Sequence, residues 1–144
     1  MGSTALHDAV ITALYYFRAG QGQRALVVLS DGDDTSSHTP FQQTMEFAQR
    51  SGVTVYAIGL GLSSLDIEAR GKLSQLAEVT GGRAFFVSRA DELQGVYGRI
   101  QEELRSRYLL AYQTEKREEG GFRPVEVRVK KRGLKARAAR GYYP

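Results

Sequence analysis

Three aspartates and four hydroxyl side chains crowd one short stretch of this 144-residue chain. The stretch, SDGDDTSS, occupies residues 30–37 and directly follows five apolar residues, ALVVL at 25–29. A short apolar run bounded by turn residues predicts a strand buried on both faces in a parallel sheet. Open α/β sheets place their ligand sites just beyond the carboxyl ends of such strands. If the chain has a site, its centre should be Asp31.

The donor atoms of this stretch are all oxygens. Carboxylates and hydroxyls are the ligands that Mg²⁺ and Mn²⁺ prefer. Mg²⁺ takes one or two protein carboxylates and keeps water-filled positions, which leaves room for a carboxylate from a partner. An acidic turn that merely caps the next helix and stays solvated explains the same residues. The spacing alone leaves both interpretations open.

Patterns for other chemistry are missing from the sequence. The loop GLGLSS at residues 59–64 lacks the third glycine of a dinucleotide-binding turn. His7 and His38 are too few for a zinc site, and no G-x-S-x-G elbow marks a hydrolase. Zero cysteines exclude disulfides and thiolate metal sites. We therefore expect no enzymatic activity.

The elements that would position the acidic stretch alternate along the chain. Helices are predicted at residues 4–17, 40–50, 64–80 and 91–104, and strands at 25–30, 53–60 and 83–87. Such alternation predicts an α/β fold, with a three-layer, Rossmann-like, doubly wound sheet of mostly parallel strands. No segment reaches the roughly 18 apolar residues that a membrane span needs.

The end of the chain has a different pattern. Residues 107–114, 122–130 and 134–139 each resemble a strand, and Val125, Val127 and Val129 alternate with charged residues, so they should face inward. We expect residues 1–106 to form the α/β domain. Residues 107–144 should form a C-terminal β-hairpin extension that packs on the same domain and continues the sheet in antiparallel fashion.

Positive charge concentrates in this extension. From Arg123 onward there are eight basic residues and one acidic residue, Glu126. Solvation of the outer face of a terminal hairpin is the simpler explanation, because lysines also discourage edge-to-edge pairing. The rival explanation is that these residues form a patch that binds nucleic acid or an anionic surface.

Several motifs together resemble the von Willebrand factor type A domain, in its carboxyl-terminal part. They are GSTALHDA at residues 2–9, LVVLSDGDDT at 26–35, VTVYAIGLG at 53–61 and GGRAFF at 81–86. The chain's ending, with Tyr108, Tyr112 and the RGY of residues 140–142, is similar to a bacterial subgroup found in predicted exported proteins. The resemblance implies an extracytoplasmic location.

The resemblance also implies a function and a site. Family members bind protein ligands through a metal-ion-dependent adhesion site, where a divalent cation accepts an Asp or Glu of the partner. By correspondence, Thr4 is the hydroxyl ligand and Asp31 the late aspartate, with Asp33 as a possible outer-shell group. The cofactor would be Mg²⁺ or Mn²⁺.

The sequence departs from the family pattern in two ways. The family's Asp-x-Ser-x-Ser motif and the three strands before Thr4 are absent, so Thr4 and Asp31 alone make an incomplete metal site. The strand Ala25–Ser30 should then be an exposed apolar edge, through which the chain forms a homodimer, swaps strands or pairs with another fragment. Residues 33–37, DDTSS, fit Asp-x-Thr-x-Ser, but nothing downstream supplies the remaining ligands of that alternative.

Overall fold

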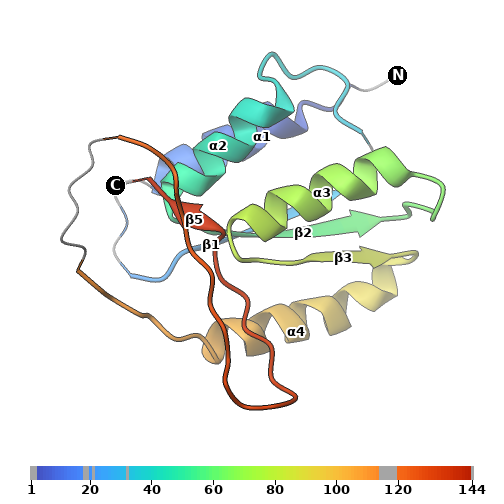
Figure 1. Ribbon diagram of the computed structural model, residues 1–144. Helices are drawn as coiled ribbons and strands as arrows, with labels where there is room; N and C mark the ends of the chain where they lie inside the picture. Colours follow the sequence, from blue (N-terminus) through green and yellow to red (C-terminus); the bar gives the residue numbers. More distant parts are fainter. Residues whose placement is uncertain (1–2, 18–19, 21, 32, 114–119, 144) are drawn as a thin grey trace.

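Helices and strands alternate along most of the chain (Figure 1). The computed structural model describes residues 3–17, 20, 22–31, 33–113 and 120–143. The elements are α1 (Leu6–Tyr16), β1 (Ala25–Ser30), α2 (Phe41–Ser51), β2 (Thr54–Leu60), α3 (Ile67–Val79), β3 (Ala84–Val87), the 3₁₀ turn η2 (Ala90–Glu92), α4 (Leu93–Arg105), β4 (Arg123–Pro124) and β5 (Gly141–Tyr142). The seven longer elements follow the predicted order, with boundaries shifted by a few residues.

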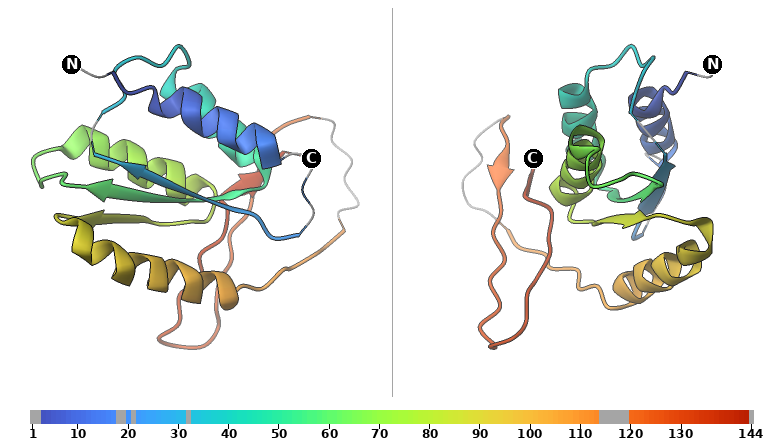
Figure 2. Two further views of the ribbon diagram at one scale, coloured as in Figure 1. Left: turned by 180° about the vertical axis from the view of Figure 1, so that it is seen from behind. Right: turned by 90° about the vertical axis from the view of Figure 1, so that its right-hand side faces the viewer.

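The first three strands form one parallel sheet in the order β1-β2-β3. Helices α1, α2 and α3 lie on one side of this sheet and α4 on the other, so that the molecule has three layers (Figure 2). This arrangement confirms the α/β, Rossmann-like prediction. The carboxyl ends of all three parallel strands meet at one edge, which is where the chain after Ser30 must emerge.

Two apolar layers hold the helices to the sheet. On the first side Leu14 of α1 packs with Val28 and Val55 of the strands and Leu76 of α3. On the other side the core cluster joins Tyr56, Ile58, Phe85 and Val87 to Val96 and Ile100 of α4. No described helix is long and apolar enough to cross a bilayer.

Strand β1 lies at the edge of the sheet that the described strands form, as predicted. The prediction that it is buried on both faces is wrong, because Val27 is 38% exposed and Leu29 47% exposed. Their register partners Tyr56 and Ile58 lie beneath α4. Helix α4 covers β2 and β3 on this side and leaves the outer face of β1 open.

The prediction of a strand at residues 107–114 is also wrong. No strand is present at residues 107–113, while residue 114 lies outside the described ranges. Tyr108, Leu109, Leu110 and Tyr112 are all exposed, by 64% to 91%. No described strand pairs with this segment, so neither a hydrogen-bonded ladder nor burial stabilises the extended pattern.

The C-terminal hairpin is docked at its base and regular only there. Strands β4 and β5 pair antiparallel over two residues each. Beyond them, the prediction of long strands at 122–130 and 134–139 is wrong, and Val127 and Val129 are 38% and 41% exposed instead of inward. An isolated two-stranded hairpin is marginal in water, and no described strand of the main sheet pairs with it.

Candidate functional site

Helix α1 begins without a capping side chain of its own. Its N-cap residue is Ala5, which has no side-chain hydrogen bond. The loop after β1 caps it instead: the amide of His7 donates to Asp34 Oδ2 at 2.8 Å, and the amide of Asp8 donates to Ser37 Oγ at 3.1 Å. These are two of the four amides that an α-helix leaves unpaired at its start. The loop is thereby fixed to the helix.

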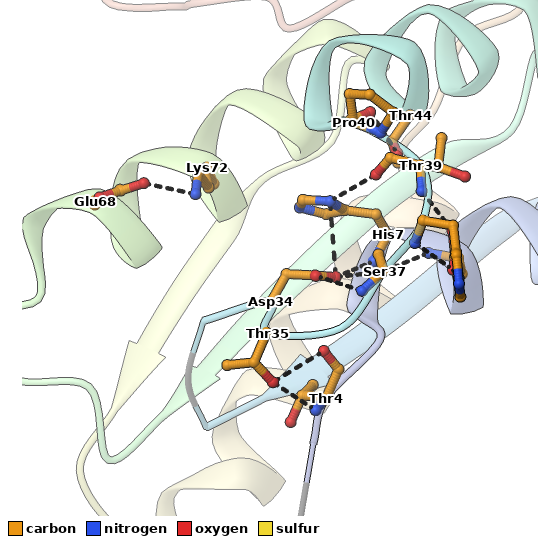
Figure 3. A network of polar contacts seen from close by, with 12 residues as sticks. Thr4, His7, Asp34, Thr35, Ser37, Thr39, Pro40, Thr44, Glu68 and Lys72 are labelled. Atoms are coloured by element: carbon orange, nitrogen blue, oxygen red, sulfur yellow. Dashed lines mark hydrogen bonds and ion pairs between the residues drawn. The ribbon is translucent and has the colours of Figure 1, made fainter.

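Asp8 makes the connection reciprocal. Its carboxylate accepts the amides of His38, at 2.9 Å, and Thr39, at 3.1 Å. The His7 ring lies beside the same loop, with Nδ1 3.2 Å from the Thr39 carbonyl oxygen and 3.7 Å from Asp34 Oδ2 (Figure 3). Two carboxylates and an imidazole therefore hold the chain between β1 and α2 against the start of α1.

Thr4 and Thr35 form a second connection just before the helix. The Thr35 amide donates to the Thr4 carbonyl oxygen at 2.8 Å, and the Thr4 amide donates to Thr35 Oγ1 at 2.9 Å (Figure 3). These bonds use the backbone of Thr4, whose side chain stays at an exposed position. They bring the residue before α1 next to the loop that follows Asp31.

The two structural carboxylates are more acidic than usual. Burial by itself would raise the pKa of Asp34, but hydrogen bonds from Ser37 and from the His7 amide lower this pKa to about 2. The His38 amide, together with Thr39, lowers the pKa of Asp8 to about 2. Both carboxylates therefore stay ionised at neutral pH, where they are the better hydrogen-bond acceptors.

Lys72 of α3 places a positive charge beside the same loop. It lines a cavity of about 10 Å³ with His7, Asp33 and Asp34, which has room for about one water molecule. Its Nζ lies 2.6 Å from Glu68, and Glu68 raises the pKa of Lys72, with further contributions from Asp33 and Asp34. This cavity, which apolar side chains of α1, α2 and α3 also line, is far smaller than a small-molecule pocket, which typically measures ~300 Å³ or more.

The three predicted site residues lie around this junction, and all are exposed. Thr4 precedes α1, Asp31 follows β1, and Asp33 lines the cavity, while Gly32 between the aspartates lies outside the described residues. Within the described ranges, no three His, Asp or Glu side chains are grouped closely enough to hold a metal ion. The oxygen donors suit Mg²⁺ in type, but a site here needs water and further donors to complete it.

Sequence reasoning missed the residues that hold the site together. The residue types of Asp34 and Ser37 suit a metal cluster, yet their side chains cap α1 and bond to each other. Thr35 likewise bonds to Thr4. These contacts weigh against residues 33–37 as a first metal-binding motif. The sequence carries no clear signal for them, because Thr4 is itself a typical capping residue, and only the structure places the N-cap at Ala5.

Comparisons with known proteins agree with this architecture. The family model of the von Willebrand factor type A domain matches residues 1–99. No curated protein matches the chain significantly. A crystal structure described as an uncharacterized membrane spanning protein from Vibrio fischeri is similar at 22% identity and a TM-score of 0.51. The match covers 65% of this chain and 52% of that one, so the present chain spans about half of that structure. The chain belongs to the von Willebrand factor type A domain family.

Proposed function

We propose that this chain is a protein-binding module whose contact surface is the carboxyl edge of its sheet. Domains of this family generally mediate protein interactions or adhesion. The observation that carries the proposal is the fixed junction between α1 and the loop 33–39, which leaves Thr4, Asp31 and Asp33 exposed around it. A rigid scaffold that presents polar side chains on loops is typical of binding sites.

The proposal includes a divalent cation, Mg²⁺ or Mn²⁺. Asp31 would hold it directly or through water, the Thr4 hydroxyl would add a neutral donor, and Asp33 would act from the outer shell. A bound cation supplies a coordination position for an Asp or Glu side chain of the partner. The proposal assigns no catalytic activity, and it keeps the bacterial, extracytoplasmic setting that the family resemblance implies.

Thermal unfolding with and without Mg²⁺ tests the cation. A ligand that binds only the folded state stabilises it by about 1.4 kcal/mol when its concentration is about ten times Kd. For a domain of this size we expect a Tm increase of roughly 3–5 °C in the parent chain. The increase should vanish in Asp31→Ala, which removes the central carboxylate.

Glu102→Ala is the matched control, because it removes one carboxylate from an exposed position on α4. It should keep the full Mg²⁺ response. Equal responses in all three proteins would show that the cation acts elsewhere. If Mg²⁺ raises the Tm of none of them, the cation is not part of the site, and binding is metal-free.

Metal-free binding through the sheet edge is the second candidate, and one observation favours it. Strand β1 ends the sheet with its outer side unpaired by any described strand, and Val27 and Leu29 are exposed beside that edge. Exposed apolar edge strands pair readily with other chains. The proposed partner is a second copy, which gives a homodimer or a strand swap through Ala25–Ser30.

Light scattering on a dilution series tests the homodimer. The parent chain should be dimeric at high concentration, and Leu29→Lys should be monomeric, because a charge on this face opposes pairing. Leu65→Lys is the control, since Leu65 is 86% exposed in a loop far along the chain from β1. Dimerisation through β1 would be ruled out if the parent chain stays monomeric throughout the series. It would also be ruled out if Leu29→Lys and Leu65→Lys have equal effects.

A further inference from the structure

The C-terminal hairpin has a docked base and a free, basic tip. At the base, Arg140 pairs with Glu78 of α3 at 2.7 Å and Arg137 pairs with Glu103 of α4. The tip carries four exposed cations, which we call the basic tip: Lys130, Lys131, Arg132 and Lys135. None of the four has an ion-pair partner among the described residues.

The charge of the hairpin contrasts with that of the rest of the molecule. Residues 123–140 hold eight basic residues and one acidic residue, a net charge of +7. Because the whole chain has a net charge of +4, the remainder has a net charge of −3. The ribbon views show the hairpin running beside the α/β body, with its tip extending beyond α4 (Figures 1 and 2). A local field of this sign attracts an anionic surface, not a neutral one.

Apolar side chains accompany the cations on this hairpin. Val127, Val129 and Leu134 are 38%, 41% and 57% exposed. Val127 lies near the base, where it lines a cavity with Glu78 and Gly81, whereas Val129 and Leu134 lie nearer the tip. All three alternate with charged residues as they would in a half-buried strand. The free part of the hairpin is therefore amphipathic, with apolar groups and ammonium or guanidinium groups only a residue apart.

This combination favours a lipid surface over a nucleic acid. Residues 123–140 contain no aromatic side chain, so the hairpin has nothing on which bases could stack. Phosphate contacts alone would not use exposed valine and leucine side chains. An anionic bilayer uses both features, because basic side chains bind its headgroups and apolar side chains enter the headgroup boundary. We propose that the hairpin 125–139 is a contact site for anionic phospholipid membranes.

Vesicle sedimentation tests the proposal on the full chain. The parent should sediment with vesicles of phosphatidylcholine containing about one-third phosphatidylserine, a headgroup charge that attracts basic residues, and not with pure phosphatidylcholine. Removing two cations with K131Q/K135Q should weaken binding roughly 25-fold, at about fivefold per charge. V129S/L134S keeps every charge and should weaken binding about tenfold through lost apolar burial.

The matched control is R99Q/R105Q, which removes two exposed cations from α4 and should change binding less than about twofold. Unchanged circular dichroism spectra would confirm that all variants fold. Equal losses in the two charge variants would overturn the proposal, because net charge alone would then explain binding. It would also be overturned by no binding to the anionic vesicles, or by binding to a DNA duplex that exceeds vesicle binding and is unaffected by V129S/L134S.

Discussion

Replacing Asp34 with alanine should lower the free energy of unfolding by about 3 kcal/mol. The change removes the acceptor for the amides of His7 and Ser37 and for the Ser37 hydroxyl. Hydrogen bonds to charged groups contribute about 1.5–3 kcal/mol each, and loss of a helix cap alone costs about 1 kcal/mol. Urea unfolding measures the difference, and Asp34→Asn, which keeps one acceptor oxygen, should lose about half as much.

Asp33→Ala is the control for this prediction. Asp33 is exposed and accepts no hydrogen bond within the described chain. Asp33→Ala should therefore change the free energy of unfolding by less than about 0.5 kcal/mol. Equal losses at the two positions would contradict the capping role of Asp34.

Acid unfolding provides a second readout of the same interaction. The pKa of Asp34 and that of Asp8 are both lowered to about 2 in the folded chain, from an ordinary value of 3.8. Carboxylates with a lowered pKa stabilise the fold above the unfolded pKa, and this contribution is lost as the pH falls from 4 toward 2. The parent should therefore lose stability across this interval more steeply than Asp34→Ala does.

Gly82→Ala should lower the free energy of unfolding about as much as Asp34→Ala does, for a steric reason. A Cβ atom at Gly82 would lie 1.9 Å from the carbonyl oxygen of Val55 and 2.8 Å from its carbonyl carbon. Val55 is fully buried near the start of β2, where it pairs with Leu26 of β1, so neither backbone can move without disturbing the sheet. Overpacking in a core costs about 1–3 kcal/mol and occasionally more, and a clash with backbone atoms belongs at the upper end of this range. We expect a large fall in the urea midpoint.

Gly71→Ala is the opposite case and serves as control. Gly71 lies inside α3, and a Cβ there would meet no atom within 4 Å beyond the adjacent residues and the backbone of its own helix. Because alanine favours the helix over glycine by about 0.8–1.0 kcal/mol, this variant should be more stable than the parent. A mild effect of Gly82→Ala, comparable in size to that of Gly71→Ala, would show that β2 and the turn before β3 are not packed as described.

The sequence predicted those parts of the fold in which local pattern and burial agree. Strand β2 is mostly apolar and is buried along most of its length, so its pattern predicted a strand correctly. The resemblance to the family predicted in addition that β1 lies at the edge of the sheet. The hairpin and residues 107–113 have the same alternation or apolar content without a neighbour to pack against. Whether such a neighbour exists depends on the whole structure, and no local pattern reveals it.

The sequence predicted where the acidic loop emerges but not how its side chains bond. The carboxyl end of β1 was identified correctly as the point where the acidic loop emerges. The side chains of Asp8 and Asp34 proved to be structural acceptors, because a helix and a loop far apart in sequence satisfy each other's backbone amides. Contacts between residues about 30 positions apart cannot be read from either segment alone.

The most direct test of the proposed function is the position at which Mn²⁺ binds. This paramagnetic ion broadens the NMR signals of nearby amides, so a spectrum of the labelled chain locates it. We predict selective broadening of residues 3–6, 31 and 33–36 in the parent, which contain Thr4, Asp31 and Asp33, and none there in Asp31→Ala. Broadening confined to other carboxylates, such as Glu102 on α4, or no selective broadening, would contradict a cation site at this edge of the sheet.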